Sequence, residues 1–418
     1  MTAGHRAPRR VGVVGAGMNG LACAWFLQQA GVDVTVVERT DVAAGASWGN
    51  AGLLTPALSV PLPEPSVLRY GVRALADPRS PVSVPVRADR DLARFLTRFV
   101  AHCTGGRWRR GMAAYRPLNE QALEAFDELA RGGVAAPTRV APFTAACRTE
   151  REAEHFAAEI GRVVGAGQAV DVELLTASEL RDQLPMLAPS MRMGVRVLGQ
   201  RAIDPPAYVA ALADSVRACG GKIVTGVDVA GVRRDGGKIS LATRDGQYAE
   251  QFDAAVLASG AWLPELGAAH GVRTPVHGGR GYSFTVDAEH PIPEPVDFPG
   301  LRLACAPYRG GVRVTGIMEF QRPDAAADER KFATIRESAA AALTTVDWSS
   351  ARDHWVGARP VTSDGLPLIG ATATPGLHVT GGHGMWGMTL GPLSGKLLAE
   401  LIVTGRTPRE LLPLDPCR

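Results

Sequence analysis

The sequence predicts an α/β protein that combines a Rossmann-like dinucleotide-binding domain with a second domain of α+β type, built on a mainly antiparallel sheet. Three observations predict this architecture. The chain opens with a complete strand–helix–strand unit, its middle alternates helices with short β-rich runs, and a glycine-rich strand–loop–helix returns near its end. A chain of 418 residues is also too long for one compact core and fits two domains.

The opening unit occupies residues 11–39. A β-branched strand is followed by Gly15, Gly17 and Gly20 in G-x-G-x-x-G spacing, by a helix predicted over 21–30, and by a second strand that ends at Glu38. Gly15 permits the tight turn, Gly17 lets the backbone approach a pyrophosphate, and Gly20 lets the helix pack closely on the strand. The phosphates would lie at the helix N-terminus, and Glu38 can accept hydrogen bonds from a ribose diol. These features predict a dinucleotide cofactor, with an ordinary βα turn as the alternative.

The next part of the chain leads through the predicted second domain and back. Small residues at 43–55 suit a backbone that passes close to a ligand, and the proline-rich stretch 56–65 indicates a crossing between domains. Apolar spacing then predicts the subsequent elements. They are helices within 90–133, at 150–164 and at 208–219, a segment at 177–184, a strand at 222–232, a hairpin from 238–243 and the run before Asp253, and a buried strand at 253–258.

The last third predicts the second domain and the return to the first sheet. Short β-rich runs at 282–286 and 312–317 and a helix at 332–343 indicate an antiparallel sheet with covering helices. A strand at 377–380, a glycine loop and a helix at 390–403 come next. The nucleotide domain is therefore expected to be discontinuous. Its predicted segments are 1–56, 190–274 and 351–418, and those of the substrate domain are 57–189 and 275–350.

Composition points to small-molecule partners. A net charge of +3 is small for this length, and the arginines are expected to be scattered rather than striped along one face, so no nucleic-acid footprint is expected. The six cysteines lie far apart without metal-ligand spacing, which predicts free thiols in a reducing compartment and no metal site. The basic N-terminus lacks a separate apolar region, and no transmembrane segment is expected. A cytoplasmic protein is predicted, with peripheral attachment at the inner face of a membrane and assembly as a homo-oligomer left open.

Four stretches resemble the FAD-dependent oxidoreductases of the D-amino-acid oxidase superfamily. They are the fingerprint with Glu38, SWGNAGLLTP at 47–56, VLASGAW at 256–262, and GARPVTSDGLPLIG at 357–370 together with GGHGMWGMTLGP at 381–392. The resemblance covers nearly the whole chain, and it is closest to the D-amino-acid dehydrogenases, with similarity also to glycine and sarcosine oxidases. It implies a D-amino-acid oxidase-like fold and FAD as the cofactor.

The resemblance also implies which residues hold FAD. A nicotinamide enzyme has no need for the third glycine-rich segment, whose backbone N–H groups and helix dipole can stabilise the negative charge of a reduced flavin. Gly381 belongs to this loop. The expected cofactor-binding residues are Gly15, Gly17, Met18, Asn19, Gly20, Glu38, Arg39, Ser47, Asn50, Ala51, Gly52, Leu53, Val229, Ser259, Gly260, Trp262, Gly357, Gly382, Gly384, Met385, Gly387, Met388 and Thr389.

For the substrate, the resemblance implies that Arg359 pairs with a carboxylate, because a planar guanidinium suits a bidentate contact. A surface ion pair is the alternative. Some relatives have an additional tyrosine and a second arginine, which would fall near Ala304 and at Met385 in this chain. Arg359 is therefore expected to bind the substrate carboxylate alone or together with Tyr308, Tyr282 or Arg309. His383 is a candidate catalytic residue or flavin neighbour. Met385 and Trp386 are candidate pocket walls, although an aromatic residue is more often part of the packing.

The expected reaction takes a hydride from the carbon next to nitrogen of an amino acid or N-substituted amino acid. The imine then hydrolyses to an oxo acid and an amine or ammonia. Oxidation of a 2-hydroxy acid would use the same arginine but needs a base for the hydroxyl proton. A flavin-binding subunit or sensor without catalysis is the alternative from another class. The sequence leaves open the chirality of the substrate and whether O2 or a quinone accepts the electrons.

Overall fold

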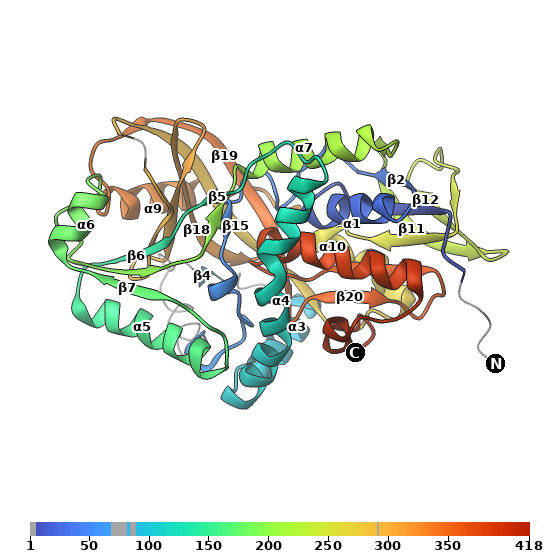
Figure 1. Cartoon of the computed structure of the whole chain (residues 1–418), viewed down its shortest axis with the longest axis horizontal. Coiled ribbons are helices and arrows are strands. Elements are labelled where there is room, and N and C mark those ends of the chain that lie inside the picture. The colour runs from blue at the N-terminus through green and yellow to red at the C-terminus, as the bar shows by residue number, and fades with distance from the viewer. Residues whose placement is uncertain (1–5, 68–81, 84–88, 291) are drawn as a thin grey trace.

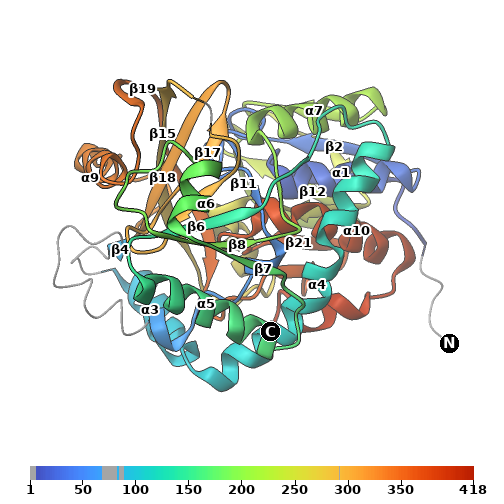
Figure 2. The ribbon, with the colours of Figure 1, turned by 60° about the vertical axis from the view of Figure 1, so that its left-hand side comes forward.

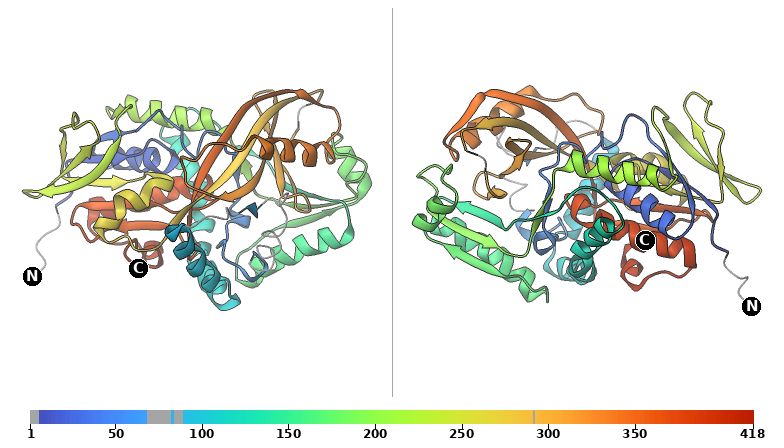
Figure 3. Two further views of the ribbon diagram at one scale, coloured as in Figure 1. Left: turned by 180° about the vertical axis from the view of Figure 1, so that it is seen from behind. Right: turned by 45° about the horizontal axis from the view of Figure 1, so that its top comes forward.

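A computed structural model describes residues 6–67, 82–83, 89–290 and 292–418. The molecule has two parts that lie side by side (Figure 1). One part contains a parallel sheet with helices, and the other is built on a large, mainly antiparallel sheet. Figure 3 shows the same arrangement from behind and from above. This confirms the predicted fold class.

The parallel sheet carries the N-terminal fingerprint. Within the described ranges it has six strands in the order β10-β2-β1-β14-β21-β20, and only β20 is antiparallel to its neighbour. The strands are β1 (Arg10–Val14), β2 (Asp33–Val37), β10 (Lys222–Val224), β14 (Ala254–Leu257), β20 (Leu368–Ala371) and β21 (Leu377–Gly381). Their continuous apolar runs, such as VGVV and AAVL, are typical of parallel strands buried on both faces.

Four helices share one hydrophobic core with this sheet. They are α1 (Met18–Gln29), α4 (Gly105–Arg131), α7 (Pro205–Ala218) and α10 (Gly387–Thr404). Both α1 and α10 begin three residues before the predicted helices. Their first turns contain glycine and polar residues that lack an apolar period, so the sequence pattern could not reveal where the helices start.

The large sheet forms the other part. The described chain contributes nine strands, in the order β19-β15-β18-β17-β16-β6-β8-β7 with β4 beside β18. They are β4 (Val82–Ser83), β6 (Phe143–Cys147), β7 (Val172–Leu175), β8 (Met193–Val197), β15 (Val276–Ala288), β16 (Val296–Phe298), β17 (Leu303–Tyr308), β18 (Gly311–Phe320) and β19 (Val346–Thr362). Helix α9 (Glu329–Ala340) packs on β15, β18 and β19 (Figure 2), and α5 (Glu150–Gly165) packs on β6 and β8. Helix α6 (Ala177–Gln183) contacts β7 and β8.

Two features of the strands differ from the sequence expectation. The strand predicted at 222–232 is wrong, because Gly226 at φ +77° breaks the run into β10 and β11 (Val229–Asp235). These two strands belong to different sheets, and β11 pairs with β12 (Lys238–Thr243), which in turn pairs with β13 (Gln251–Phe252). Strand β19 runs across the predicted domain boundary at 350/351, and β8 joins the large sheet although segment 190–274 was assigned to the nucleotide domain. The division into domains stays a prediction.

Smaller elements complete the chain. Strands β3 (Leu53–Leu54), β5 (Arg139–Val140) and β9 (Arg201–Ala202) form a short sheet, and α3 (Arg90–His102) and α8 (Leu263–Gly267) are further helices. The proline-rich stretch predicted as a domain crossing begins with a 3-10 turn, Pro56–Leu58. None of the described helices is long and apolar enough to span a bilayer. The described residues also contain no group of three metal-ligating side chains.

Candidate active site

A cleft of about 400 Å³ opens at the carboxyl ends of β1, β2 and β14. This is the edge of a parallel sheet at which ligands bind in open α/β folds. Its far wall comes from the end of β19 and from the loop before α10. Most of the predicted site residues line it: Gly15, Gly17, Met18, Asn19, Glu38, Arg39, Ser47, Asn50, Val229, Ser259, Gly260, Trp262, Arg359, His383, Gly384, Met385, Gly387 and Met388.

The glycines of the fingerprint are required where they stand. Gly15 has φ +113°, and a Cβ atom there would lie 2.5 Å from the carbonyl oxygen of Ala258. A Cβ atom on Gly20 would lie 2.0 Å from the carbonyl oxygen of Gly15. Gly20 does not line the cleft, and it instead lets α1 pack closely behind it. The backbone at Gly15 and Gly17 is thereby left open to a ligand.

Glu38 is fixed at one end of the cleft. One carboxylate oxygen accepts a hydrogen bond from the backbone N–H of Ala16 at 2.8 Å, and the other accepts one from that of Thr40 at 3.0 Å. Oε1 also accepts from the Thr40 hydroxyl at 3.3 Å, whereas Oε2 keeps a second lone pair that can accept a hydrogen bond from a ligand hydroxyl. Beside it, the guanidinium of Arg39 stacks 4.0 Å from the ring centre of Trp262. This end suits a ribose.

The middle of the cleft is lined by Ser47 and Asn50. The Ser47 hydroxyl accepts from the backbone N–H of Met18 at 3.3 Å, and Asn50 Oδ1 accepts from that of Gly52 at 2.8 Å. Opposite them, the Ser259 hydroxyl is buried without a hydrogen-bond partner among the described residues. An unpaired buried hydroxyl in a cleft wall is suited to a ligand that supplies the missing partner.

The two helices that begin at the cleft differ from the other long helices. A side chain caps the N-terminus of α3, α4, α5, α6, α7 and α9, from Asp89, Thr104, Thr149, Thr176, Asp204 and Asp328. In contrast, α1 and α10 begin after Gly17 and Trp386 with no side-chain cap. The N–H of Met18 at the start of α1 donates to Ser47, whereas the other N–H groups of both first turns and the positive dipole ends are available to negative charge on a bound molecule.

Arg359, near the end of β19, lines the wall that the large sheet contributes to the cleft. Its Nη1 donates one long hydrogen bond, 3.5 Å, to the carbonyl oxygen of Ile317. None of the described carboxylates lies within ion-pair distance of it. Burial lowers its pKa to about 10, which still leaves the guanidinium charged at neutral pH. Arg359 therefore presents several unused N–H donors, the arrangement that a planar carboxylate requires.

His383 also lines the cleft, but both ring nitrogens are occupied. Its Nδ1 lies 2.9 Å from Asn19 Nδ2, and its Nε2 lies 2.8 Å from Ser394 Oγ. Because Ser394 Oγ donates to the carbonyl oxygen of Leu390 at 2.8 Å, Nε2 carries the hydrogen and Nδ1 accepts from Asn19. Burial lowers the pKa of His383 to about 3. This geometry favours a neutral imidazole that joins α1 to α10 over a proton acceptor.

Several predicted residues lie behind the cleft or away from it. Ala51, Gly52 at φ +74° and Leu53 in β3 follow directly after the stretch 47–50, whose first and last residues line the cleft. The Thr389 hydroxyl donates to the carbonyl oxygen of Leu53 and accepts from the N–H of Thr55. Gly357 and Gly382 pack against Trp355 and Thr362.

The candidate aromatic residues also lie outside the cleft. Tyr282 points to the other face of the large sheet and donates to Glu319 at 2.8 Å. Tyr308 packs on Arg313, and Trp386 Nε1 donates to the carbonyl oxygen of Val60 at 2.7 Å.

The cleft also contains residues that the sequence analysis did not single out. The most informative are Asp228 and Arg244, an ion pair with a distance of 2.6 Å at the Glu38 end. Asp228 lies within the run that the sequence predicts as one strand, 222–232, and Arg244 comes directly after strand 238–243 of the predicted hairpin, so nothing in the sequence pattern pointed to either as a site residue. The others include Thr40, Ala44, Gly45, Ala46, Val227, Ala258, Ala261, Glu265, Leu266, Ala358 and Pro360. Most of them lie in the segments that follow β2, β10 and β14, whereas Ala358 and Pro360 lie within β19.

Comparison with known proteins agrees with this geometry. The family model described as FAD dependent oxidoreductase matches residues 10–401. A D-amino acid dehydrogenase of Xanthobacter autotrophicus is 31% identical over 411 residues, which are 96% of this chain and 96% of that protein. Glycine oxidase from Geobacillus kaustophilus has a TM-score of 0.73 at 24% identity, and that from Bacillus cereus 0.72 at 21%. Each structural match covers 98% of this chain and 99% of the other, and shows the fold.

FAD fits the residues of the cleft. The glycine cradle and the uncapped α1 suit its two phosphates, Glu38 suits its ribose, and the uncapped α10 suits the ring that gains negative charge on reduction. The matches confirm the resemblance found in the sequence. The chain belongs to the FAD-dependent oxidoreductase family and is an enzyme whose cofactor is FAD.

Proposed function

We propose that this enzyme oxidises an amino acid or an N-substituted amino acid at the carbon next to nitrogen. The printed names of the relatives support this substrate class, since they are a D-amino acid dehydrogenase and glycine oxidases. The observation that carries the proposal is Arg359, a cationic side chain at the cleft without a carboxylate partner among the described residues. A substrate carboxylate would supply that partner.

The roles of the protein groups follow from the chemistry. Bound FAD supplies the acceptor of two electrons. Arg359 would hold the carboxylate, so that the reacting C–H bond is oriented before the hydride leaves with its electron pair. The nitrogen lone pair forms the C=N bond of the imine, which water then hydrolyses. The uncapped N-terminus of α10 would stabilise the negative charge that develops at the cofactor.

His383 favours an amine over a 2-hydroxy acid as the substrate. Oxidation of a neutral amine needs no protein base for the hydride transfer, whereas oxidation of an alcohol must release the hydroxyl proton. The histidine that lines the cleft uses its acceptor nitrogen to bind Asn19. It is therefore poorly placed to take that proton.

The test is anaerobic reduction of the FAD by candidate substrates. Replacement of Arg359 by Ala is expected to raise the substrate dissociation constant about 100-fold, because a charge-assisted contact is lost, while FAD stays bound. Arg244→Ala is the matched control, since Arg244 lines the cleft from the end of β12 rather than from the large sheet and should leave substrate affinity unchanged. Unchanged affinity in Arg359→Ala would remove this residue from the substrate site.

The same reduction experiment distinguishes the substrate classes. If hydroxy acids reduce the FAD and no amino acid does, the alternative substrate class is favoured. If neither amino acids nor hydroxy acids reduce it, both proposed substrate classes are wrong.

The electron acceptor and the location are part of the same proposal. Either O2 or a quinone would reoxidise the cofactor, and turnover in air compared with turnover with a soluble quinone under argon distinguishes them. We infer a cytoplasmic location, which is supported by six cysteines that are all unpaired and all lie within the described residues.

A further inference from the structure

An arginine-rich pair of helices stands apart from the rest of the surface. We call residues 90–116, which comprise α3 and the first turns of α4, the arginine hairpin. It contains seven arginines and one aspartate, a net charge of +6, although the full chain carries only +3. The remaining 391 residues therefore carry a net charge of −3. The two helices meet at the lower end of the molecule in Figure 1.

The arginines of α3 form a stripe, which corrects the expectation that the arginines are scattered. Helix α3 buries Leu92, Phe95 and Phe99 against the body of the protein, where Phe95 and Phe99 contact the ring of Phe320. The opposite face is exposed and carries arginines four residues apart, at positions 90, 94 and 98. Just beyond the turn, α4 adds the exposed residues Arg107, Arg109 and Arg110.

Within this short stretch of chain, most of the charges lack an ion-pair partner among the described residues. Within the part of the chain that the structure describes, Arg94, Arg98, Arg109 and Arg110 have no carboxylate at ion-pair distance. Arg116 has one exposed partner, Glu120, at 3.8 Å. Elsewhere some exposed arginines are paired at 3.1 Å or less, such as Arg131, Arg148, Arg217 and Arg330. Others, such as Arg233 and Arg234, have no such partner among the described residues, but none of these arginines lies in a comparable run of arginines without acidic neighbours. The hairpin therefore projects an uncompensated positive field.

The surface between the arginines is also distinctive. The exposed residues among them are small or weakly apolar, such as Ala93, Ala101, Ala113 and Val100, whose exposed fraction is 46%. All four aromatic residues of the hairpin, Phe95, Phe99, Trp108 and Tyr115, are buried. No phenylalanine, tryptophan or tyrosine ring of the hairpin is therefore available to stack on an unpaired base. A convex array of guanidinium groups fits a broad anionic surface.

We propose that the arginine hairpin docks this protein onto a bilayer that contains anionic phospholipids. Guanidinium groups would contact lipid phosphates, while the small residues between them permit close approach. Each basic residue near such a surface strengthens binding roughly fivefold. Val100 is the one large apolar side chain of the hairpin that is exposed, so the attachment is mainly electrostatic, reversible and sensitive to salt.

The test is sedimentation of the full-length, FAD-loaded protein with lipid vesicles. One variant replaces Arg94, Arg98, Arg109 and Arg110 by Gln. The matched control replaces four exposed arginines elsewhere, Arg217, Arg233, Arg234 and Arg330, by Gln, so that both variants lose the same charge. Vesicles of phosphatidylcholine alone are compared with vesicles that also contain phosphatidylglycerol. The FAD content and the unfolding temperature of each variant report its folding.

The unaltered protein is expected to bind only the vesicles with phosphatidylglycerol and to be released as salt rises. The hairpin variant should bind at least about 100-fold more weakly, because four fivefold contributions are lost, and the control variant should stay within about threefold. Equal weakening in both variants would reduce the effect to net charge and overturn the proposal. Absence of binding to these vesicles by the unaltered protein would also overturn the proposal. So would a competition experiment in which a DNA or RNA duplex releases the protein from anionic vesicles at a lower phosphate concentration than additional anionic vesicles require. None of these measurements uses turnover, so the result is independent of the proposed reaction.

Discussion

His383 shows how hydrogen bonds decide what a single residue can do. The glycine loop that carries it resembles a catalytic segment, and a histidine there is a natural candidate for a base. In the folded protein, Asn19 occupies Nδ1 and Ser394 occupies Nε2, so the neutral ring links the first turn of α1 to the body of α10. His383 is thus better suited to positioning the two helices at the cofactor than to accepting a proton.

Replacement of His383 by Gln should change how stability depends on pH. The folded state keeps the pKa near 3, whereas an unfolded histidine titrates near 6.5, so the unfolded state binds more protons between these values. The free energy of unfolding contributed by His383 is therefore present above pH 6.5 and is lost as pH falls toward 3, by up to about 1.4 kcal/mol per pH unit. Urea unfolding between pH 4 and 7 should give a shallower loss in His383→Gln. Parallel curves for the two proteins would refute this role.

The same variant tests whether His383 acts as a base. Gln can accept a hydrogen bond from Asn19 and donate one to Ser394, so the helices should keep their positions. The rate of FAD reduction at saturating substrate is expected to keep the pH profile of the unaltered enzyme. Loss of an inflection in this profile on substitution would restore His383 as a proton acceptor.

At the scale of elements, close contact between α1 and α10 holds the two uncapped N-termini at the cleft. The contact depends on glycines of α10. A Cβ atom on Gly395 would lie 2.5 Å from the backbone nitrogen of Cys23 and 2.8 Å from the carbonyl carbon of Ala22. A Cβ atom on Gly391 would lie 2.4 Å from Asn19 Oδ1. Backbone atoms cannot yield as a flexible side chain can, so a substitution at Gly395 must separate the helices.

Gly395→Ala is expected to lower the free energy of unfolding by about 1–3 kcal/mol through overpacking, even though alanine is the better helix former. The affinity for FAD should fall with it, because both helices contribute their N-termini to the cleft. Gly161→Ala in α5 is the matched control, since a Cβ atom there meets nothing within 4 Å. It should be neutral or stabilise the protein by up to about 1 kcal/mol. Urea unfolding and titration with FAD measure both effects, and a Gly395→Ala variant as stable as the control would contradict the packing argument.

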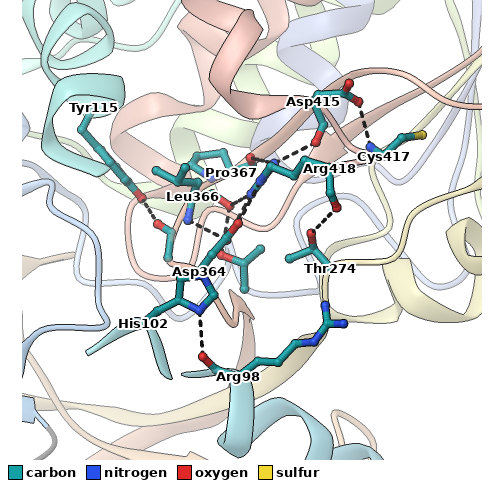
Figure 4. A network of polar contacts seen from close by, with 12 residues as sticks. Arg98, His102, Tyr115, Thr274, Asp364, Leu366, Pro367, Asp415, Cys417 and Arg418 are labelled. Atoms are coloured by element: carbon teal, nitrogen blue, oxygen red, sulfur yellow. Dashed lines mark hydrogen bonds and ion pairs between the residues drawn. The ribbon is translucent and has the colours of Figure 1, made fainter. Parts of the chain in front are cut away.

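At the scale of the whole molecule, one polar network fixes the turn between the two sheets. This turn comes after β19 of the large sheet and precedes β20 of the parallel sheet. Arg418 contacts both carboxylate oxygens of Asp364, at 2.8 and 3.1 Å, and donates to the carbonyl oxygens of Leu366 and Pro367 (Figure 4). Tyr115 of α4 donates to the carbonyl oxygen of Gly365 at 2.9 Å. The network therefore links α4, the turn and the last described residue.

Arg418→Met is expected to lower the free energy of unfolding by about 2–3 kcal/mol, because it leaves the Asp364 carboxylate, only 15% exposed, without its partner. Arg217→Met removes an ion pair whose side chains are 48% and 74% exposed, and should change stability by less than about 1 kcal/mol. Urea unfolding of both variants at neutral pH measures the difference. Equal effects would show that the network contributes no more than an ordinary surface pair.

Local sequence determined the features that depend on neighbours along the chain. The spacing of Gly15, Gly17 and Gly20 predicted a phosphate-binding turn, and the structure shows that a Cβ atom on Gly15 or Gly20 would collide with the backbone. The order of fingerprint, returning strand and final glycine loop identified FAD and the family, which the matches confirm. Apolar periodicity located most helices, because the buried face of a helix consists of residues three and four apart.

Only the tertiary structure decided which side chains meet. Tyr282 was a candidate for the substrate clamp, but alternation along β15 turns it to the far face of the sheet, toward Glu319. The partner of Arg359 could not be inferred from the chain, because the absence of a described carboxylate near it depends on segments distant in sequence. The same holds for the arginine stripe, which becomes visible once the buried face of α3 is known. A local pattern fixes the backbone conformation of a segment, whereas the surroundings of a side chain are set by long-range pairing of strands and packing of helices.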